Sequence, residues 1–171
     1  MVRTRTRASA RRGVAVVELA VLLPFLLVVL LGIWEVGRLI EIQQILNNAA
    51  REGARIAAQG QIINQTSAPT QIQVNSGTPD VYDTVKNYLT RAGIDTTGMQ
   101  LNFAFTSGNT ALTDPYQATK GQSFQVTVSI PFNNVRWTVL SLTNITQLSA
   151  TVVWQSLVDD PFTINTTLPS W

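Results

Sequence analysis

The sequence predicts an α+β fold: a long N-terminal helix, membrane-spanning in its first half, packed on a small antiparallel sheet, with one short extra helix. Three observations support this. Residues 14–34 form an apolar run of membrane length. A stripe of apolar residues at helical spacing follows it. Beyond Gly98 the period changes to two, as in strands with one side facing water.

The first 13 residues form a basic leader. They contain five arginines and no acid, whereas the rest of the chain carries seven basic and ten acidic side chains. Because basic flanks remain in the cytoplasm, Arg11 and Arg12 are expected to orient the N-terminus inside and the domain outside. The basic character ends with the leader, so nucleic acid is not an expected partner. The arginines are Arg3, Arg5, Arg7, Arg11 and Arg12.

Residues 14–34 are predicted to be a transmembrane segment. As a helix they would span about 31 Å, enough to cross the hydrocarbon core. The run is too long for the apolar core of a cleavable signal peptide. Pro24 removes one backbone hydrogen bond and is expected to kink the helix. A carboxylate in such a segment costs about 2.5–3.5 kcal/mol, so Glu18 indicates a function.

The helix is predicted to continue through residues 35–60, for about 45 residues in all. An apolar stripe along this helix is expected to pack against the sheet, and its smallest members, Ala49 and Gly53, would let another element approach closely. Gly60 is a plausible stop. Arg51, Glu52 and Arg55 form a charged cluster off the stripe. The stripe consists of Leu39, Ile42, Leu46, Ala49, Gly53 and Ile56.

The rest of the chain, residues 61–171, is predicted to be the outer α+β domain. We expect a loop at 60–79 and a helix at 80–92, with Thr78 as N-cap, Pro79 at its first position and Gly93 closing it. A polar loop at 107–121, an irregular or helical crossover at 135–142, and a tail beyond Asp160 that is loosely ordered or an edge strand complete it. Strands are expected around 101–105, 124–130 and 148–154.

Candidate catalytic or metal sites are lacking in the sequence. Without Cys or His there are no disulfides, thiol chemistry, His-based triads or zinc sites of the usual kind. Asp80 and Asp83 could act as an acid–base pair, but acids at a helix start usually cap it. Asp159 and Asp160 precede a proline, which favours a turn over a calcium site. We therefore expect no enzymatic activity, no cofactor and no metal.

The basic head, Gly13, and Glu18 five residues later in a long apolar helix resemble the type IV pilin superfamily. Residues 11–38 and 47–60 are similar to the TadE-like family, the minor pilins or pseudopilins of tight-adherence (Tad/Flp) pili. This resemblance implies a pilin-like fold and cleavage by a prepilin peptidase between Gly13 and Val14. It also implies that Glu18 packs beside the new N-terminus of a neighbouring subunit.

Leu19 departs from the family pattern, because processed Tad pilins typically have tyrosine after the glutamate. Two functions therefore stay open. One is a TadE-like minor pilin or pseudopilin that takes part in assembling a pilus for surface adhesion. The other is an uncleaved, single-pass envelope protein of the bacterial inner membrane with an outer binding domain. The resemblance implies other pilin subunits, the prepilin peptidase and the inner membrane as partners.

Overall fold

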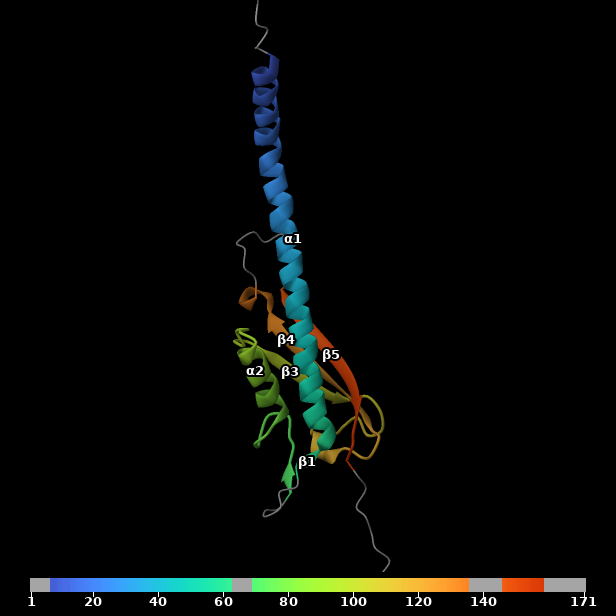
Figure 1. Cartoon of the computed structure of the whole chain (residues 1–171). Helices are drawn as coiled ribbons and strands as arrows, with labels where there is room; N and C mark the ends of the chain where they lie inside the picture. The colour runs from blue at the N-terminus through green and yellow to red at the C-terminus, as the bar shows by residue number, and fades with distance from the viewer. Residues whose placement is uncertain (1–6, 63–68, 136–145, 159–171) are drawn as a thin grey trace, which may run out of the picture. The chain divides into compact units, whose positions relative to one another are not determined.

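The computed structural model describes residues 7–62, 69–135 and 146–158, with side chains from Gly13 onwards. Their elements are a long helix, a short helix and small antiparallel sheets (Figure 1), which confirms the predicted α+β class. The chain divides into two compact units, residues 1–41 and 42–171, which are treated separately below. Most of the predicted crossover at 135–142 and the tail beyond Asp160 lie outside the described residues.

Helix α1 runs from Arg7 to Gln59 and comprises 53 residues. It begins within the leader, so it is longer than predicted. Pro24 lies inside it without ending it. Gly60 ends it as expected: its φ of +65° is a conformation that favours glycine, and its N–H donates to the carbonyl of Ala57 at 3.1 Å.

In the C-terminal unit, one face of α1 is buried from Ile42 to Ala58. The stripe was predicted correctly at Ile42 and Leu46, which are fully buried, whereas Leu39 and Ile56 are only half-buried. Small residues explain the difference, because they let neighbouring elements close over the helix and leave Ile56 at the border. The buried small residues are Ala49, Ala50, Gly53, Ala54, Ala57 and Ala58.

Helix α2, Val81–Arg91, buries Val81, Val85 and Leu89, and the first two of these lie against Gly53 of α1. Its predicted position is confirmed, but the predicted cap is wrong. Asp80 is the N-cap, and its side chain accepts a hydrogen bond from the N–H of Asp83 at 2.6 Å. A carboxylate satisfies a free N–H of the first turn better than Thr78, two residues before the cap, could.

Three strands form the main sheet in the order β3-β4-β5, antiparallel throughout: β3 Gln100–Phe105, β4 Ser123–Pro131 and β5 Gln147–Gln155. All three were predicted. The side chains of β4 alternate between buried and half-buried, so one face lies on the core and the other faces water. The inner face carries a cluster of aromatic rings, in which Phe103 lies 5.0 Å from Phe105 and 5.2 Å from Phe124 between centroids.

Helix α1 is hydrogen-bonded to edge strand β5 and to the segment that directly follows it. The side-chain amide of Gln43 donates to the Ser149 carbonyl at 2.9 Å, and the N–H of Leu157 donates to the Ala58 carbonyl at 2.8 Å. The Ser149 carbonyl and the Leu157 N–H point away from β4, because the even-numbered residues of this part of the chain make the bonds to β4. The N–H of Ser156, for example, donates to the carbonyl of Gln122. The edge of β5 is therefore partly covered by a helix, a common protection against strand pairing.

The loop predicted at 60–79 contains a small two-stranded antiparallel sheet that was not predicted. It pairs β1, Gln61–Ile62, with β2, Thr70–Gln71. Two-residue strands are too short to show alternation, which explains the miss. Two 3-10 helices, η1 Pro115–Gln117 and η2 Phe132–Asn134, add single turns.

Candidate membrane and assembly segment

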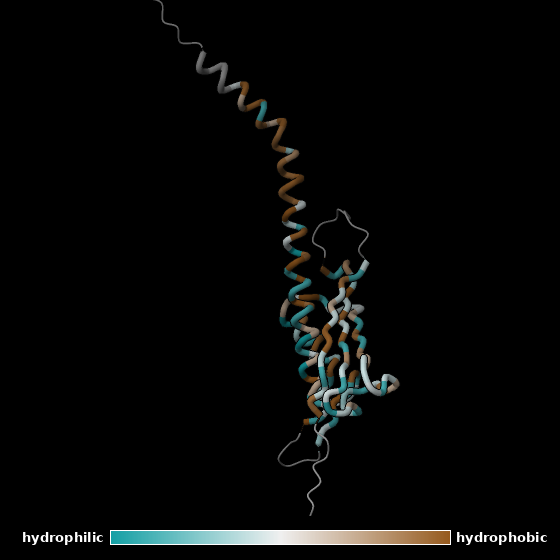
Figure 2. The backbone as a smooth tube through the Cα atoms, turned by 90° about the vertical axis from the view of Figure 1, so that its right-hand side faces the viewer, coloured by the Kyte–Doolittle hydropathy of each residue, from teal (hydrophilic) through white to brown (hydrophobic). Residues whose placement is uncertain are grey.

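The N-terminal unit contains the apolar part of α1. Nearly every side chain from Val14 to Trp34 is exposed, with Val21 70% and Phe25 67% accessible. Figure 2 shows this part of the helix as an almost unbroken hydrophobic stretch. An isolated helix that is apolar all round has no face suited to water, so it requires lipid or other apolar helices around it. By length and composition, α1 could cross a membrane.

Gly13 lies inside α1, yet packing within the chain does not require a glycine there. A methyl group added at Gly13 would meet no atom within 4 Å among the described residues. Glycine in a helix interior costs about 1 kcal/mol relative to alanine. Packing among the described residues therefore does not offset this cost.

Glu18 and Val14 are four residues apart on α1, so they lie on the same helix face. Glu18 is exposed, and within the described part of the chain no hydrogen bond or ion pair involves it. Leu19 is 56% exposed. The carboxylate is thus surrounded by apolar side chains of its own helix and is open to a partner from outside.

The other residues of this segment to which the sequence assigned a role, Arg11, Arg12 and Pro24, all lie in α1. Arg11 and Arg12 lie in the first turns of α1, and their side chains fall outside the described set. Arg11 precedes Glu18 by seven residues, or about two turns. Pro24 follows Glu18 by six residues, within the same helix.

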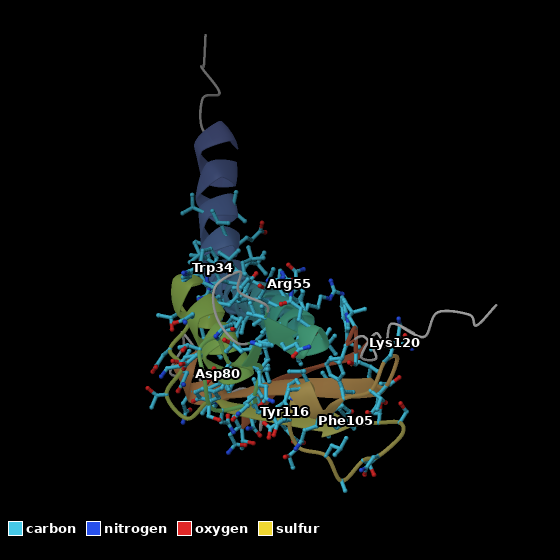
Figure 3. The ribbon with its side chains drawn as sticks, turned by 90° about the horizontal axis from the view of Figure 1, so that it is seen from below. Trp34, Arg55, Asp80, Phe105, Tyr116 and Lys120 are labelled. Carbon is cyan, nitrogen blue, oxygen red and sulfur yellow. The ribbon has the colours of Figure 1, made fainter. Side chains whose placement is uncertain are left out.

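In the outer half of α1 the charged cluster resolves into a defined ion pair. Arg55 contacts Glu52 through two hydrogen bonds, Nη2 to Oε1 at 2.7 Å and Nε to Oε2 at 3.0 Å. These bonds lower the pKa of the Glu52 carboxyl and raise that of Arg55. The sequence predicted only a charged cluster off the stripe, although Glu52 and Arg55 already had the spacing of an i,i+3 pair. Figure 3 places Arg55 on α1, away from the sheet.

Asp80 and Asp83 do not form a carboxylate pair of catalytic geometry. Asp80 is 5% exposed and engaged in the cap of α2, and burial raises the pKa of its carboxyl. Asp83 is exposed and supplies the capped N–H. Among the described residues, no cluster of three or more acidic side chains could hold a metal ion.

The comparisons with known proteins concern the N-terminal half of α1 and its continuation. Residues 13–55 match the family model described as TadE-like protein. No curated protein and no solved structure matches the chain. The match supports a membrane-anchored protein associated with Tad pili. It begins at Gly13 and ends at Arg55, so the TadE-like resemblance is confirmed for the part of the chain that contains the membrane-length segment and most of the buried alanine face of α1.

Proposed function

We propose that this chain is a TadE-like minor pilin or pseudopilin that takes part in assembling a tight-adherence pilus for surface adhesion. One observation carries the proposal: the family match includes a helix segment whose apolar side chains are exposed on all sides. Such a segment suits both lipid before assembly and neighbouring helices afterwards. The proposed role is structural, without catalysis or a cofactor.

The proposed topology has a single pass through the bacterial inner membrane. The arginine-rich leader, residues 1–13, lies in the cytoplasm, and residues 14–34 cross the membrane. Residues 35–60 continue the helix outside, and residues 61–171 form the extracytoplasmic domain. Trp34 supports this boundary, because indole rings collect at membrane interfaces.

Cleavage between Gly13 and Val14 by a prepilin peptidase is the next step of the proposal. The glycine has no packing partner in the described chain, which agrees with a need for glycine in recognition by an enzyme. The cut would leave the α-amino group of Val14 one helical turn from Glu18.

Glu18 would then fix the register between subunits. An ammonium group from a neighbour's Val14 would neutralise the carboxylate in a low-dielectric environment, where an unpaired charge is costly. A buried polar contact of this kind favours one axial register over the many that apolar side chains alone permit. Lateral packing of residues 14–34 would supply most of the remaining contact.

The first experiment is the N-terminal sequence and intact mass of the protein purified from its native membrane. A chain beginning at Val14 is expected. A chain that keeps residues 1–13, in cells whose prepilin peptidase is active, would favour the uncleaved anchored envelope protein. That alternative is supported by Leu19, which stands where processed Tad pilins typically have tyrosine.

Glu18→Ala tests the assembly contact separately from processing. We expect this variant to insert in the membrane but to lose piliation and co-purification with other pilins. Leu22→Ala, one turn further along the helix, is the matched control and should retain both. If Glu18→Ala assembles as well as Leu22→Ala, the proposed role of the carboxylate is wrong.

A further inference from the structure

Beyond Trp34, helix α1 is apolar on one side and charged on the other. Val36 and Ile40, four residues apart on the apolar side, are both more than half exposed. Arg38 and Glu41 lie on the charged side, where Nη1 of Arg38 contacts Oε2 of Glu41 at 2.8 Å. The apolar surface of α1 therefore ends near residue 34 on one side of the helix and only at Ile40 on the other.

This oblique end of the apolar surface is what a helix that leaves the membrane at a tilt requires. The surface of a bilayer cuts a tilted helix obliquely, so the side that leans towards the lipid stays in contact with it for longer. Residues 34–40 cover about 9 Å along the axis, and a helix with its side chains is about 10–12 Å wide, so the offset corresponds to a tilt of about 40°. Tilts of membrane helices reach this value.

Glu18 lies on the same side of α1 as Val36, because their separation in sequence corresponds to about five full turns. In a tilted helix, the side that leans towards lipid at the outer end leans towards water at the inner end. In an upright helix, Glu18 would lie about 6 Å inside the hydrocarbon, since it follows Val14 by four residues. At a tilt of about 40°, its side enters the hydrocarbon about three residues later. The carboxylate then lies near the boundary, where water and headgroups lower the cost of its charge.

We propose that α1 crosses the membrane at a tilt of about 40°, with Val36 and Ile40 on the outer lipid surface and Glu18 turned towards the cytoplasm. Features at opposite ends of the segment thus give the same direction of tilt. Lipid covers the apolar side because this side continues the membrane-length run through Ile33, which is 66% exposed, and an amphipathic helix of this kind suits the membrane interface. The inference rests on the proposed function for its single-pass topology, and it extends the lipid contact beyond residue 34 on one side.

Spin labels in the full chain test the tilt, and the absence of cysteine allows one label at a time. Each variant is reconstituted at a low protein-to-lipid ratio into vesicles of phosphatidylethanolamine and phosphatidylglycerol. Electron paramagnetic resonance compares the collisions of the label with oxygen, which concentrates in hydrocarbon, and with a water-soluble nickel complex, and so measures its depth. Arg38→Cys and Ile40→Cys form the outer pair, Ala20→Cys and Leu22→Cys form the inner pair, and Phe25→Cys reports on insertion itself. All five positions are exposed.

The tilt reverses the order of depth within each pair. Arg38 precedes Ile40 by about 3 Å along the axis, so an upright helix would place the Arg38 label deeper. Because the two labels lie on opposite sides of a helix about 10–12 Å wide, we expect the Ile40 label to be about 4–5 Å deeper instead. The Ala20 label should likewise be about 4–5 Å deeper than the Leu22 label, although Leu22 lies further from the leader. Loss of the Arg38 charge favours a deeper label and so acts against the expected order.

The possible outcomes separate the tilt from the proposed function. The order of an upright helix at either pair would overturn the tilt. A label at Ile40 that is shielded from both oxygen and nickel would overturn the lipid contact, because a helix of a second copy would then cover this side. A Phe25 label outside the hydrocarbon would refute the membrane topology of the proposed function and the tilt with it. The vesicles hold no other pilus component, so a failure of processing or assembly in cells leaves the measured tilt unaffected.

Discussion

At Gly53, α1 lies close to both α2 and β4. A Cβ added there would lie 2.6 Å from Cγ2 of Val85, 3.4 Å from Cγ1 of Val81 and 3.7 Å from Cγ1 of Val126. Real Cβ atoms essentially never approach another carbon as closely as the first of these contacts. Val85 is fully buried and β-branched, so it has little freedom to turn aside.

The substitution Gly53→Ala therefore sets two effects against each other. Alanine improves helix propensity by about 1 kcal/mol. Overpacking a core costs about 1–3 kcal/mol, and a contact this short belongs at the upper end. We expect a net loss of about 2 kcal/mol in the free energy of unfolding of the domain, or roughly 5–10 °C in melting temperature.

Thermal unfolding of the full chain in detergent, followed by circular dichroism, measures the effect. Gly37→Ala is the matched control, because it replaces a glycine of the same helix that has no neighbour within 4 Å among the described residues. It should melt no lower than the parent chain. Val85→Ala should destabilise on its own by about 2–3 kcal/mol, through lost burial and a cavity.

The double variant Gly53→Ala/Val85→Ala decides the reasoning. The methyl group at position 53 would occupy space that Val85 has vacated, so the two losses should not add. We expect the double variant to be at least about 1 kcal/mol more stable than the sum of the single variants predicts. Additive losses, or a Gly53→Ala variant that melts like the parent, would show that α2 does not approach α1 at Gly53 as the structure describes.

Substitutions at two further residues, Glu52 and Asp80, test the electrostatics of the domain. Because the ion pair with Arg55 lowers the pKa of Glu52, its contribution is present above the pKa of an unfolded glutamate and is lost as pH falls through the folded pKa. Glu52→Gln should therefore cost less than about 1 kcal/mol at pH 7 and nothing in acid, where a melting difference that persists would argue against the pair. Burial instead raises the pKa of Asp80, so its contribution is largest in acid and falls as pH rises through the folded pKa. Asp80→Asn keeps the capping oxygen, so its stability relative to the parent should rise as pH increases from 3 to 7. Asp80→Ala loses the cap and should cost about 1 kcal/mol. Melting curves across this pH range check both, and an asparagine variant that gained nothing would contradict the reasoning.

The sequence predicted those parts of the fold that depend on long periodic segments. Helix α1 and strands β3, β4 and β5 each extend over enough residues for a period to be counted. The N-cap of α2 was misassigned because Thr78, Pro79 and Asp80 all suit the start of a helix. Only the folded chain, in which Asp80 is buried at the end of α2, decides which of them caps it.

The two halves of α1 show why the membrane and assembly segment, residues 14–34, could be recognised in the sequence although its side chains are exposed in the structure of one chain. From residue 42 onwards the apolar side chains occupy one face, and the sheet and α2 cover that face. From Val14 to Trp34 they occupy every face, and within the described chain none of them is buried. Burying one large apolar side chain is worth about 1.5–3 kcal/mol, so a segment of this kind is stable only in surroundings that the chain itself does not supply. Gly13 and Glu18 fit the same argument, since among the described residues no contact offsets the cost of a glycine in a helix interior or of a carboxylate in a membrane-length segment. In the proposed function, Gly13 serves recognition by the prepilin peptidase, and Glu18 pairs with the N-terminus of a neighbouring subunit.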